Sequence, residues 1–398
     1  MPSWSARCCK VAGETSCATT WCSPPGGRCS GAGCCWPRAS CGCACVRPCS
    51  RRFIAIALRG LVALIDGEVE RHVDRLVAEA RATGKVAMAH AMARLTQEVF
   101  VRAMFSTSLD RDLDRLLAAW TVVHHYVAGR LISPVRVPAS WPTPGNRRLR
   151  EAMAVLDSIL RPLVVARRRA QLAGEDTHDL LGMLLAARDP ETGEGLSDEL
   201  LHEQILMTFF AGFETTSSAL TRVWLLLAEH PEVEQRLHAE LDAVLGDRRP
   251  IADDLAKLTW LRMILDETLR LYPSAFMLTR QSVGEQELGG HRIRAGAVAF
   301  ISTWVMHRNP ALWPDPLRFD PERFDPAKPA HDRFAYIPFG AGPRLCIGKQ
   351  LALMEAQLIV AGIARRLRAR PIEGERYPVE PLFTLHVPGG APMRIEPR

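Results

Sequence analysis

Apolar positions recur at helical spacing along most of the chain after residue 51, and few helix-breaking residues interrupt them. Their pattern predicts amphipathic helices over residues 53–83, 87–105, 110–129, 147–173 and 177–188. Short clusters of Gly, Pro and Ser separate these segments. The Leu, Val and Met stripes of these helices are typical of residues that fill a protein core.

The next predicted helix is longer and apolar on most of its faces. It begins after Ser197, a suitable N-cap, and continues to His230, which precedes a proline. At about 1.5 Å per residue it would be roughly 48 Å long. A helix that is apolar all round lies inside a large protein. In its middle, however, stands Ala211-Gly212-Phe213-Glu214-Thr215-Thr216, where a glycine, an acid and two hydroxyls replace the apolar residues that packing alone would favour.

The remaining pattern predicts a helical protein with little sheet. Further helices are expected over residues 231–245, 258–271 and 347–368. Short strands are expected within residues 276–302, with a hairpin turn at Gly289-Gly290. Residues 309–345 show no periodicity, and an irregular stretch of this length inside a compact domain is usually functional. The fold class we predict is mainly α with small β-sheets.

Composition and charge narrow the class of protein. The chain has 398 residues, of which 47% are hydrophobic and 24% are charged, as in soluble globular proteins. The net charge is +6, but residues 51–398 carry only +2, so there is no basic field of the kind that binds nucleic acid. No apolar run is long enough to span a bilayer, and the N-terminus lacks the apolar stretch of a secretory signal. We therefore expect no nucleic-acid partner, no transmembrane segment and a cytoplasmic location.

Cysteine usage separates residues 1–50 from residues 51–398. Eleven of the twelve cysteines lie between Cys8 and Cys49, in a segment with almost no Leu, Ile, Val or Phe. A zinc module is one interpretation, although the Cys-x-Cys spacings fit the usual zinc patterns poorly. A disulfide scaffold would need an oxidising compartment. A disordered tail and a segment translated out of frame are the other interpretations.

The genetic code favours translation out of frame. Cys34-Cys35-Trp36-Pro37 must be encoded TGY TGY TGG CCN, which two bases later reads as Leu-Leu-Ala whatever the Y bases are. We therefore predict that residues 1–50 are not a native folded domain and that residues 51–398 form the folded domain. Codon bias restored in the shifted frame of the gene would support this interpretation.

A glycine- and proline-rich loop carries the remaining cysteine. In Phe339-Gly340-Ala341-Gly342-Pro343-Arg344-Leu345-Cys346-Ile347-Gly348, the glycines and the proline predict a tight loop whose backbone approaches another group closely. Cys346 starts a helix, where backbone N–H groups stabilise a thiolate, and Arg344 offers a cation beside it. This thiolate could be a nucleophile, for which His307 or His331 would be the candidate base, or a metal ligand, which needs no base.

The same loop resembles the cysteine-ligand loop of cytochrome P450 monooxygenases, Phe-x-x-Gly-x-Arg-x-Cys-x-Gly. Three weaker motifs follow the order of that family. The segment 211–216 resembles the oxygen-binding groove of the long central helix, Glu267-Thr268-Leu269-Arg270 resembles its Glu-x-x-Arg, and Pro321-Glu322-Arg323-Phe324 resembles the Arg-bearing motif before the loop. The resemblance covers about residues 51–398. Within the family, Arg344 and residues 307–324 look closer to the fatty-acid-hydroxylating and microsomal-type branch.

The resemblance implies a haem b site in which the Cys346 thiolate binds the iron. Four loop residues and one strand residue are expected around the cofactor, the strand residue as a partner for a haem propionate: Phe339, Gly340, Arg344, Gly348 and Arg280. On one face of a helix, Glu267 and Arg270 would form a buried ion triad with Arg323 that fixes the loop carrying Cys346.

The central helix motif supplies the expected catalytic residues, Ala211, Gly212, Glu214 and Thr215. Gly212 would leave space above a flat cofactor for a diatomic molecule. Thr215 can bond the carbonyl of Ala211 and offer its hydroxyl to bound oxygen, while Glu214 can pass protons in from solvent.

The expected activity is that of an oxidoreductase that inserts one atom of O2 into a small hydrophobic substrate. Its electrons would come from a ferredoxin or flavoprotein that docks near Arg344 and Lys349. The first sheet and early helices of the family have no counterpart in the pattern of residues 1–50. Two alternatives remain: an inactive P450-derived product of a frame-shifted gene, and a Cys-dependent hydrolase or transferase.

Overall fold

The structure is a computed structural model that describes residues 16–17, 51–106, 112–133, 137–138, 140–173, 179–188 and 193–398. For residues 16–17, 51–60, 131–132 and 172 it describes the backbone alone. The predictions made for residues 1–50, including the out-of-frame segment, lie outside the described residues apart from the strand at 16–17.

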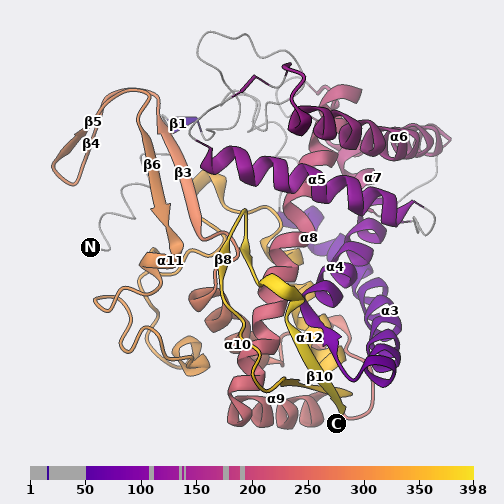
Figure 1. Cartoon of the computed structure of the whole chain (residues 1–398), viewed down its shortest axis with the longest axis vertical. Helices are drawn as coiled ribbons and strands as arrows, with labels where there is room; N and C mark the ends of the chain where they lie inside the picture. The colour runs from indigo at the N-terminus through magenta and orange to yellow at the C-terminus, as the bar shows by residue number, and fades with distance from the viewer. Residues whose placement is uncertain are drawn as a thin grey trace.

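Helices build most of the described chain (Figure 1). The α-helices are α3 (Arg51–Thr83), α4 (Met88–Phe105), α5 (Leu113–Ile132), α6 (Pro144–Leu172), α7 (Leu180–Ala186), α8 (Asp198–Glu229), α9 (Pro231–Val244), α10 (Thr259–Leu271), α11 (Thr303–Met306) and α12 (Lys349–Ala364). Short 3₁₀ helices are η1 (Ala252–Asp254), η2 (Pro321–Phe324), η3 (Gly342–Arg344) and η4 (Pro388–Gly390). The predicted class, mainly α with small sheets, is confirmed. Within the described residues, no helix is long and apolar enough to cross a membrane.

The strands are short and pair in antiparallel fashion. They are β1 (Ser16–Cys17), β2 (Val86–Ala87), β3 (Met277–Ser282), β4 (Gln286–Leu288), β5 (His291–Ile293), β6 (Val298–Ser302), β7 (Leu367–Pro371), β8 (Glu380–Pro381), β9 (Leu385–His386) and β10 (Pro392–Pro397). The sheet orders are β1-β3-β6, β2-β10-β7, β4-β5 and β8-β9. The predicted hairpin turn is confirmed, because Gly289 and Gly290 join β4 to β5 with φ of 60° and 83°, which glycine adopts without strain.

Local sequence signals set several helix ends. The Ser197 hydroxyl accepts the N–H of Leu200 at 3.2 Å, which confirms the predicted N-cap of α8. The prediction that the last helix continues to residue 368 is wrong, since α12 ends at Ala364. Leu367 instead pairs with Pro397 as the first residue of β7, so strand pairing with β10 overrides the helical pattern there.

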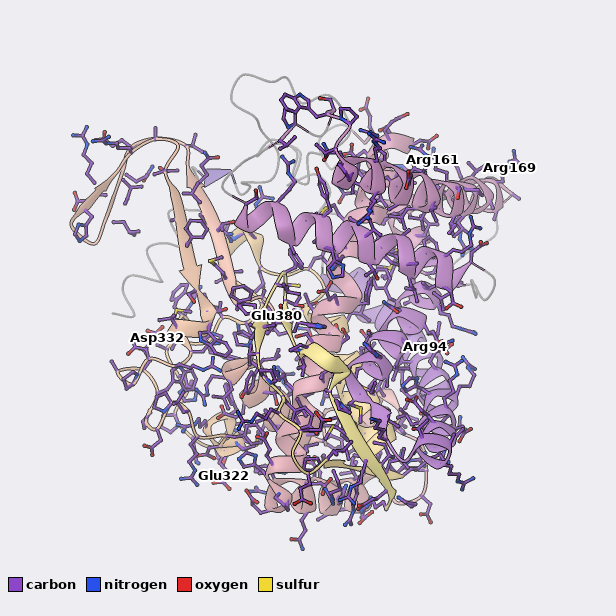
Figure 2. All side chains as sticks on the ribbon, in the orientation of Figure 1. Arg94, Arg161, Arg169, Glu322, Asp332 and Glu380 are labelled. Carbon is purple, nitrogen blue, oxygen red and sulfur yellow. The ribbon has the colours of Figure 1, made fainter. Side chains whose placement is uncertain are left out.

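Helix α8 runs through the middle of the molecule and contributes to both large apolar clusters (Figure 1). Its C-terminal half packs with α3, α4, α10 and α12, where Trp224 and Ile359 are buried. Its N-terminal half packs with α5, α6 and α7, where Phe209 and Leu116 are buried. Charged side chains such as Arg161 and Arg169 on α6 and Glu322 on η2 lie at the periphery (Figure 2). The middle of α8 is thus the meeting point of the two clusters.

A buried ion pair on α10 organises the irregular segment that leads to the cysteine loop. The Arg270 guanidinium donates to both carboxylate oxygens of Glu267, at 2.6 and 2.8 Å, and neither side chain is exposed. Its other N–H groups donate to the backbone carbonyls of His307, Pro316 and Arg318. One side chain therefore fastens three separated points of the segment to the helix.

The third member of the predicted triad lies beside the same carboxylate. Nε of Arg323 is 3.4 Å from Oε1 of Glu267, and its Nη2 donates to the carbonyl of Asp315 at 2.9 Å. The backbone N–H of Asp320 also donates to Oε1 of Glu267, at 2.9 Å. The structure thus brings together the three charges that the sequence selected, and they hold residues 307–323 against α10.

Replacement of Arg270 tests this anchoring. Arg270→Met should lower the free energy of unfolding by about 3–5 kcal/mol, because it leaves the buried carboxylate of Glu267 without its bidentate partner. Urea unfolding followed by tryptophan fluorescence measures the change.

Arg262→Met on the same helix is the matched control. Arg262 pairs with Asp266 at 2.7 Å, but its side chain is 41% exposed, so its loss should cost less than about 1 kcal/mol. Equal losses in the two variants would contradict an anchoring role for Arg270.

Candidate active site

The cysteine loop is a tight turn closed by its own backbone. The N–H of Cys346 donates to the carbonyl of Phe339 at 2.9 Å, and the N–H of Gly340 donates to that of Ile337 at 3.0 Å. Gly340 and Gly342 both have φ of 73°, a conformation that favours glycine. The result is a rigid loop that leaves the side chain of Cys346 exposed just before α12 begins.

The environment of the thiol combines burial of its surroundings with nearby donors. Desolvation raises the pKa of Cys346, while hydrogen bonds from the backbone N–H groups of Gly348 and Lys349 and the charge of Lys349 act in the opposite direction. The predicted contribution of the backbone at the helix start is therefore present. The cation that acts on the sulfur is Lys349, whereas we expected Arg344 to take this role. A metal that binds the sulfur would have to displace its proton.

The base of the loop is packed against three helices. Phe339 contacts a small buried cluster made of Ala219 from α8, Leu269 from α10 and Leu353 from α12. On the other side, Leu278 of β3 lies 3.8 Å from the position that a Cβ at Gly340 would occupy. The central helix, the triad helix and the sheet thus all meet at the cysteine loop.

One stripe of α8 faces this loop. Ala211, Thr215 and Ala219 are four residues apart and therefore lie on one face of the helix. Ala219 belongs to the buried cluster against which Phe339 packs, so the stripe continues from the base of the loop to Thr215 and Ala211. Ala211 is exposed although it lies in the middle of a long core helix, and so this end of the stripe faces a surface that the described residues do not cover.

The role predicted for Gly212 is wrong. A Cβ at Gly212 would lie 2.3 Å from the ring of Phe100 on α4, so the space that this glycine leaves is filled by that ring. Gly212 lies one residue from Ala211, about 100° around the helix, and therefore faces α4 and not the cysteine loop. Its physical role in this structure is the close approach of α4 and α8.

The hydroxyl of Thr215 is bonded as the sequence suggested. Thr215 Oγ1 donates to the carbonyl of Ala211 at 2.9 Å, and α8 remains an unbroken helix at this point. The carbonyl of Thr215 accepts a hydrogen bond from the hydroxyl of Ser274, at 2.6 Å, in the turn after α10. This second bond fixes the position of Thr215 relative to the helix that carries the triad.

Glu214 contacts two residues that the sequence analysis missed. Its Oε1 accepts a hydrogen bond from the hydroxyl of Thr384 at 2.9 Å, and its Oε2 contacts Nδ1 of His124 on α5. The one available signal was a histidine pair, His124 and His125, in an otherwise apolar helical pattern. Burial lowers the pKa of His124 to about 4, so its ring is neutral at pH 7.

Arg280 lies on the strand that flanks the loop. It is two positions after Leu278, so both side chains are on the same face of β3. Its Nη1 donates to the carbonyl of Thr279 at 2.8 Å. Its role as a partner for a haem propionate stays a prediction.

The two histidines considered as bases for a nucleophilic cysteine have other partners. His307 is buried and accepts the N–H of Ile337 at its Nε2, at 3.0 Å, while the ring of His331 bonds the carbonyl of Arg323. Desolvation lowers the pKa of His307 to about 3. Within the described residues neither ring hydrogen-bonds Cys346, so nothing in this geometry supports the hydrolase alternative.

The donor set and the uncovered surfaces fit haem. No cluster of three or more metal-binding side chains occurs in the part of the chain that the structure describes, so the single sulfur of Cys346 suits a metal that brings its other ligands with it. Leu345 and Ile347, on either side of Cys346, are 46% and 50% exposed. A flat apolar group bound to the sulfur would cover these side chains on one face and meet Ala211 and Thr215 on the other.

Comparison with known proteins shows which sequences resemble this chain. The model of the family Cytochrome P450 matches residues 49–389. Two proteins of Streptomyces melanosporofaciens are similar to this chain. A cyclooctat-9-en-7-ol 5-monooxygenase is 44% identical, and the match covers 77% of this chain and 66% of the monooxygenase. A cyclooctatin synthase is 37% identical, and the match covers 78% of this chain and 67% of the synthase. The chain thus spans about two thirds of the length of these relatives.

A solved structure extends the similarity to three dimensions. The crystal structure of a cytochrome P450DA heme domain superposes with a TM-score of 0.77 at 28% identity, over 89% of this chain and 76% of that one. The family model, the curated relatives and this solved structure all indicate the same family. The chain belongs to the cytochrome P450 family, whose cofactor is haem b.

Proposed function

We propose that this protein is a haem-thiolate monooxygenase that inserts one atom of O2 into a small hydrophobic substrate. The observation that carries the proposal is the stripe of α8 that rises from the cysteine loop, with Thr215 and Ala211 at its uncovered end. The name of the Streptomyces relative gives an unsaturated cyclic alcohol as its substrate, and we assign the same class to this chain.

The overall reaction fixes what the protein must supply. One C–H bond and one molecule of O2 are converted to an alcohol and water, which consumes two electrons and two protons. Bound haem supplies the iron at which O2 is activated, and Cys346 holds that iron through its sulfur. The remaining task of the chain is to deliver two protons to the site and to keep the substrate there.

Two side chains of α8 are suited to move these protons. Thr215 holds its hydroxyl on the uncovered stripe, with Oγ1 bonded to the carbonyl of Ala211. Glu214 is the preceding residue, and its side chain is 26% exposed, so it can exchange a proton with solvent. Proton delivery by this acid and hydroxyl is our assignment of their roles.

The electron donor is proposed to be a separate ferredoxin or flavoprotein. The cysteine loop offers it a docking surface in which Lys349 provides positive charge beside the sulfur and Arg344 lies two positions before Cys346 in the chain. Acidic surfaces on such a partner would match these charges.

The first test concerns the iron ligand. The reduced protein with carbon monoxide should show the red-shifted Soret band of thiolate-ligated haem, and Cys346→Ala should lose it because Cys346 carries the sulfur of this loop. A difference spectrum of the purified full chain measures the band.

Cys49→Ala is the matched control, since it removes one of the eleven cysteines of the N-terminal segment and not the loop cysteine. The control should keep the band. A red-shifted band that persists in Cys346→Ala would disprove the assignment of Cys346.

The second test concerns the hydroxyl on α8. Thr215→Ala should lower product formation per electron by about tenfold or more, because this hydroxyl no longer directs protons to the oxygen atom that leaves as water. The electrons should then be recovered as hydrogen peroxide, in which O2 has taken up two electrons and two protons. Product and peroxide are quantified with cyclooctat-9-en-7-ol, NADPH and a surrogate ferredoxin system.

Thr216→Ala serves as the control for this variant. Its hydroxyl makes the equivalent bond to the carbonyl of Gly212, at 3.2 Å, but the residue is buried and faces away from the stripe. An equal rise in peroxide per electron in both variants would argue against a specific role for Thr215.

With isotopically labelled O2, the wild-type product should carry one labelled oxygen atom, and a product without label would refute the proposed function.

A further inference from the structure

The carboxylate of Glu214 is held from two sides by segments far apart in the sequence. Thr384, in the turn between β8 and β9, donates to Oε1 at 2.9 Å. His124, on α5, contacts Oε2 through Nδ1. The β8-β9 hairpin is itself fastened to α8, because the hydroxyl of Ser218 donates to the carbonyl of Leu385 at 2.7 Å. Of the two contacts, only the one with His124 joins α8 to a different helix.

The surroundings of His124 determine how it bonds. Its side chain is 11% exposed, and its ring lies 4.5 Å from that of Phe210, 5.8 Å from that of Phe383 and 6.2 Å from that of Phe213, centroid to centroid. In this apolar setting the ring is neutral, so it carries a single N–H. The carboxylate accepts hydrogen bonds, and therefore that N–H belongs on Nδ1.

The other ring nitrogen of His124 lacks a hydrogen bond in this arrangement, which is unfavourable. Nε2 of His124 is buried and has no hydrogen-bond partner. An unpaired polar atom among aromatic rings is unfavourable, so the polar contacts of the ring, with the Glu214 carboxylate and with the backbone of Phe210, are what favour a histidine at this position. The aromatic contacts alone would suit a phenylalanine or leucine equally well.

We propose that His124 is a positioning residue that holds the Glu214 carboxylate against α5 and keeps it from supplying protons until α5 moves relative to α8. This inference rests on the proposed function. In the structure both oxygens of Glu214 are occupied by His124 and Thr384, while the Thr215 hydroxyl donates to Ala211. A substrate that entered between the aromatic rings of α5 and α8 would separate the two helices and release the acid.

Removal of the histidine should therefore release Glu214 without substrate. We expect His124→Leu to raise substrate-free hydrogen peroxide release by about fivefold, the factor to which the net free energy of one hydrogen bond corresponds. In this step O2 takes up two electrons, from NADPH through a surrogate ferredoxin system, and two protons. His124→Asn keeps an N–H near the place of Nδ1 and should remain close to wild type.

The neighbouring His125 provides the matched control. It is exposed, and its Nδ1 bonds the carbonyl of Thr121 on its own helix, so His125→Leu should leave peroxide release unchanged. If His124→Leu matches wild type, or if His124→Asn is altered as much as His124→Leu, the inference is wrong and the histidine is only a packing residue.

A second readout does not depend on turnover. If His124 and Glu214 interact, the stability lost in His124→Leu combined with Glu214→Gln should be clearly less than the sum of the two single losses, as measured by urea unfolding. Additive losses would overturn the contact itself. If the wild type instead lacks the thiolate-haem band or forms no labelled product, the proposed function fails, while this cycle still decides whether His124 holds Glu214.

Discussion

The guanidinium of Arg270 is the constraint on which the geometry of the site depends. Residues 309–320 have no periodic pattern of apolar positions, and they form neither a helix nor a strand. Arg270 replaces that missing regularity with a fixed fork of donors, two for Glu267 and the others for backbone carbonyls. The irregular segment is thereby held to the same helix whose Leu269 lies beneath the cysteine loop.

Each face of α8 contacts a different part of the protein, so neighbouring residues of this helix have different roles. At about 100° per residue, neighbouring positions in 211–215 face different partners. Gly212 faces α4, where its missing side chain admits Phe100, and Glu214 faces α5 and the β8-β9 turn. Ala211 and Thr215 remain on the stripe above the cysteine loop. A shift of the helix by one residue would place a different side chain on every face.

Much of this arrangement follows from the sequence because its signals are local. The N-cap at Ser197 and the turn at Gly289-Gly290 depend on a few adjacent residues, and both are found where they were predicted. Glu267 and Arg270 were selected by their resemblance to the Glu-x-x-Arg of the family, and their i, i+3 spacing places them on one helix face. In each of these cases the chemistry of a short segment determines the outcome.

The predictions that failed concern features that depend on residues far apart in the sequence. Which face of α8 Gly212 occupies depends on Phe100, more than a hundred residues earlier in the chain, and no local pattern reports that contact. The end of α12 at Ala364 depends on pairing between β7 and β10. His124 was read as part of a generic apolar helix because its partner, Glu214, lies on another helix. Contacts between residues far apart in the sequence therefore determine how the side chains of α8 are held, whereas local sequence determines where many helices and turns begin and end.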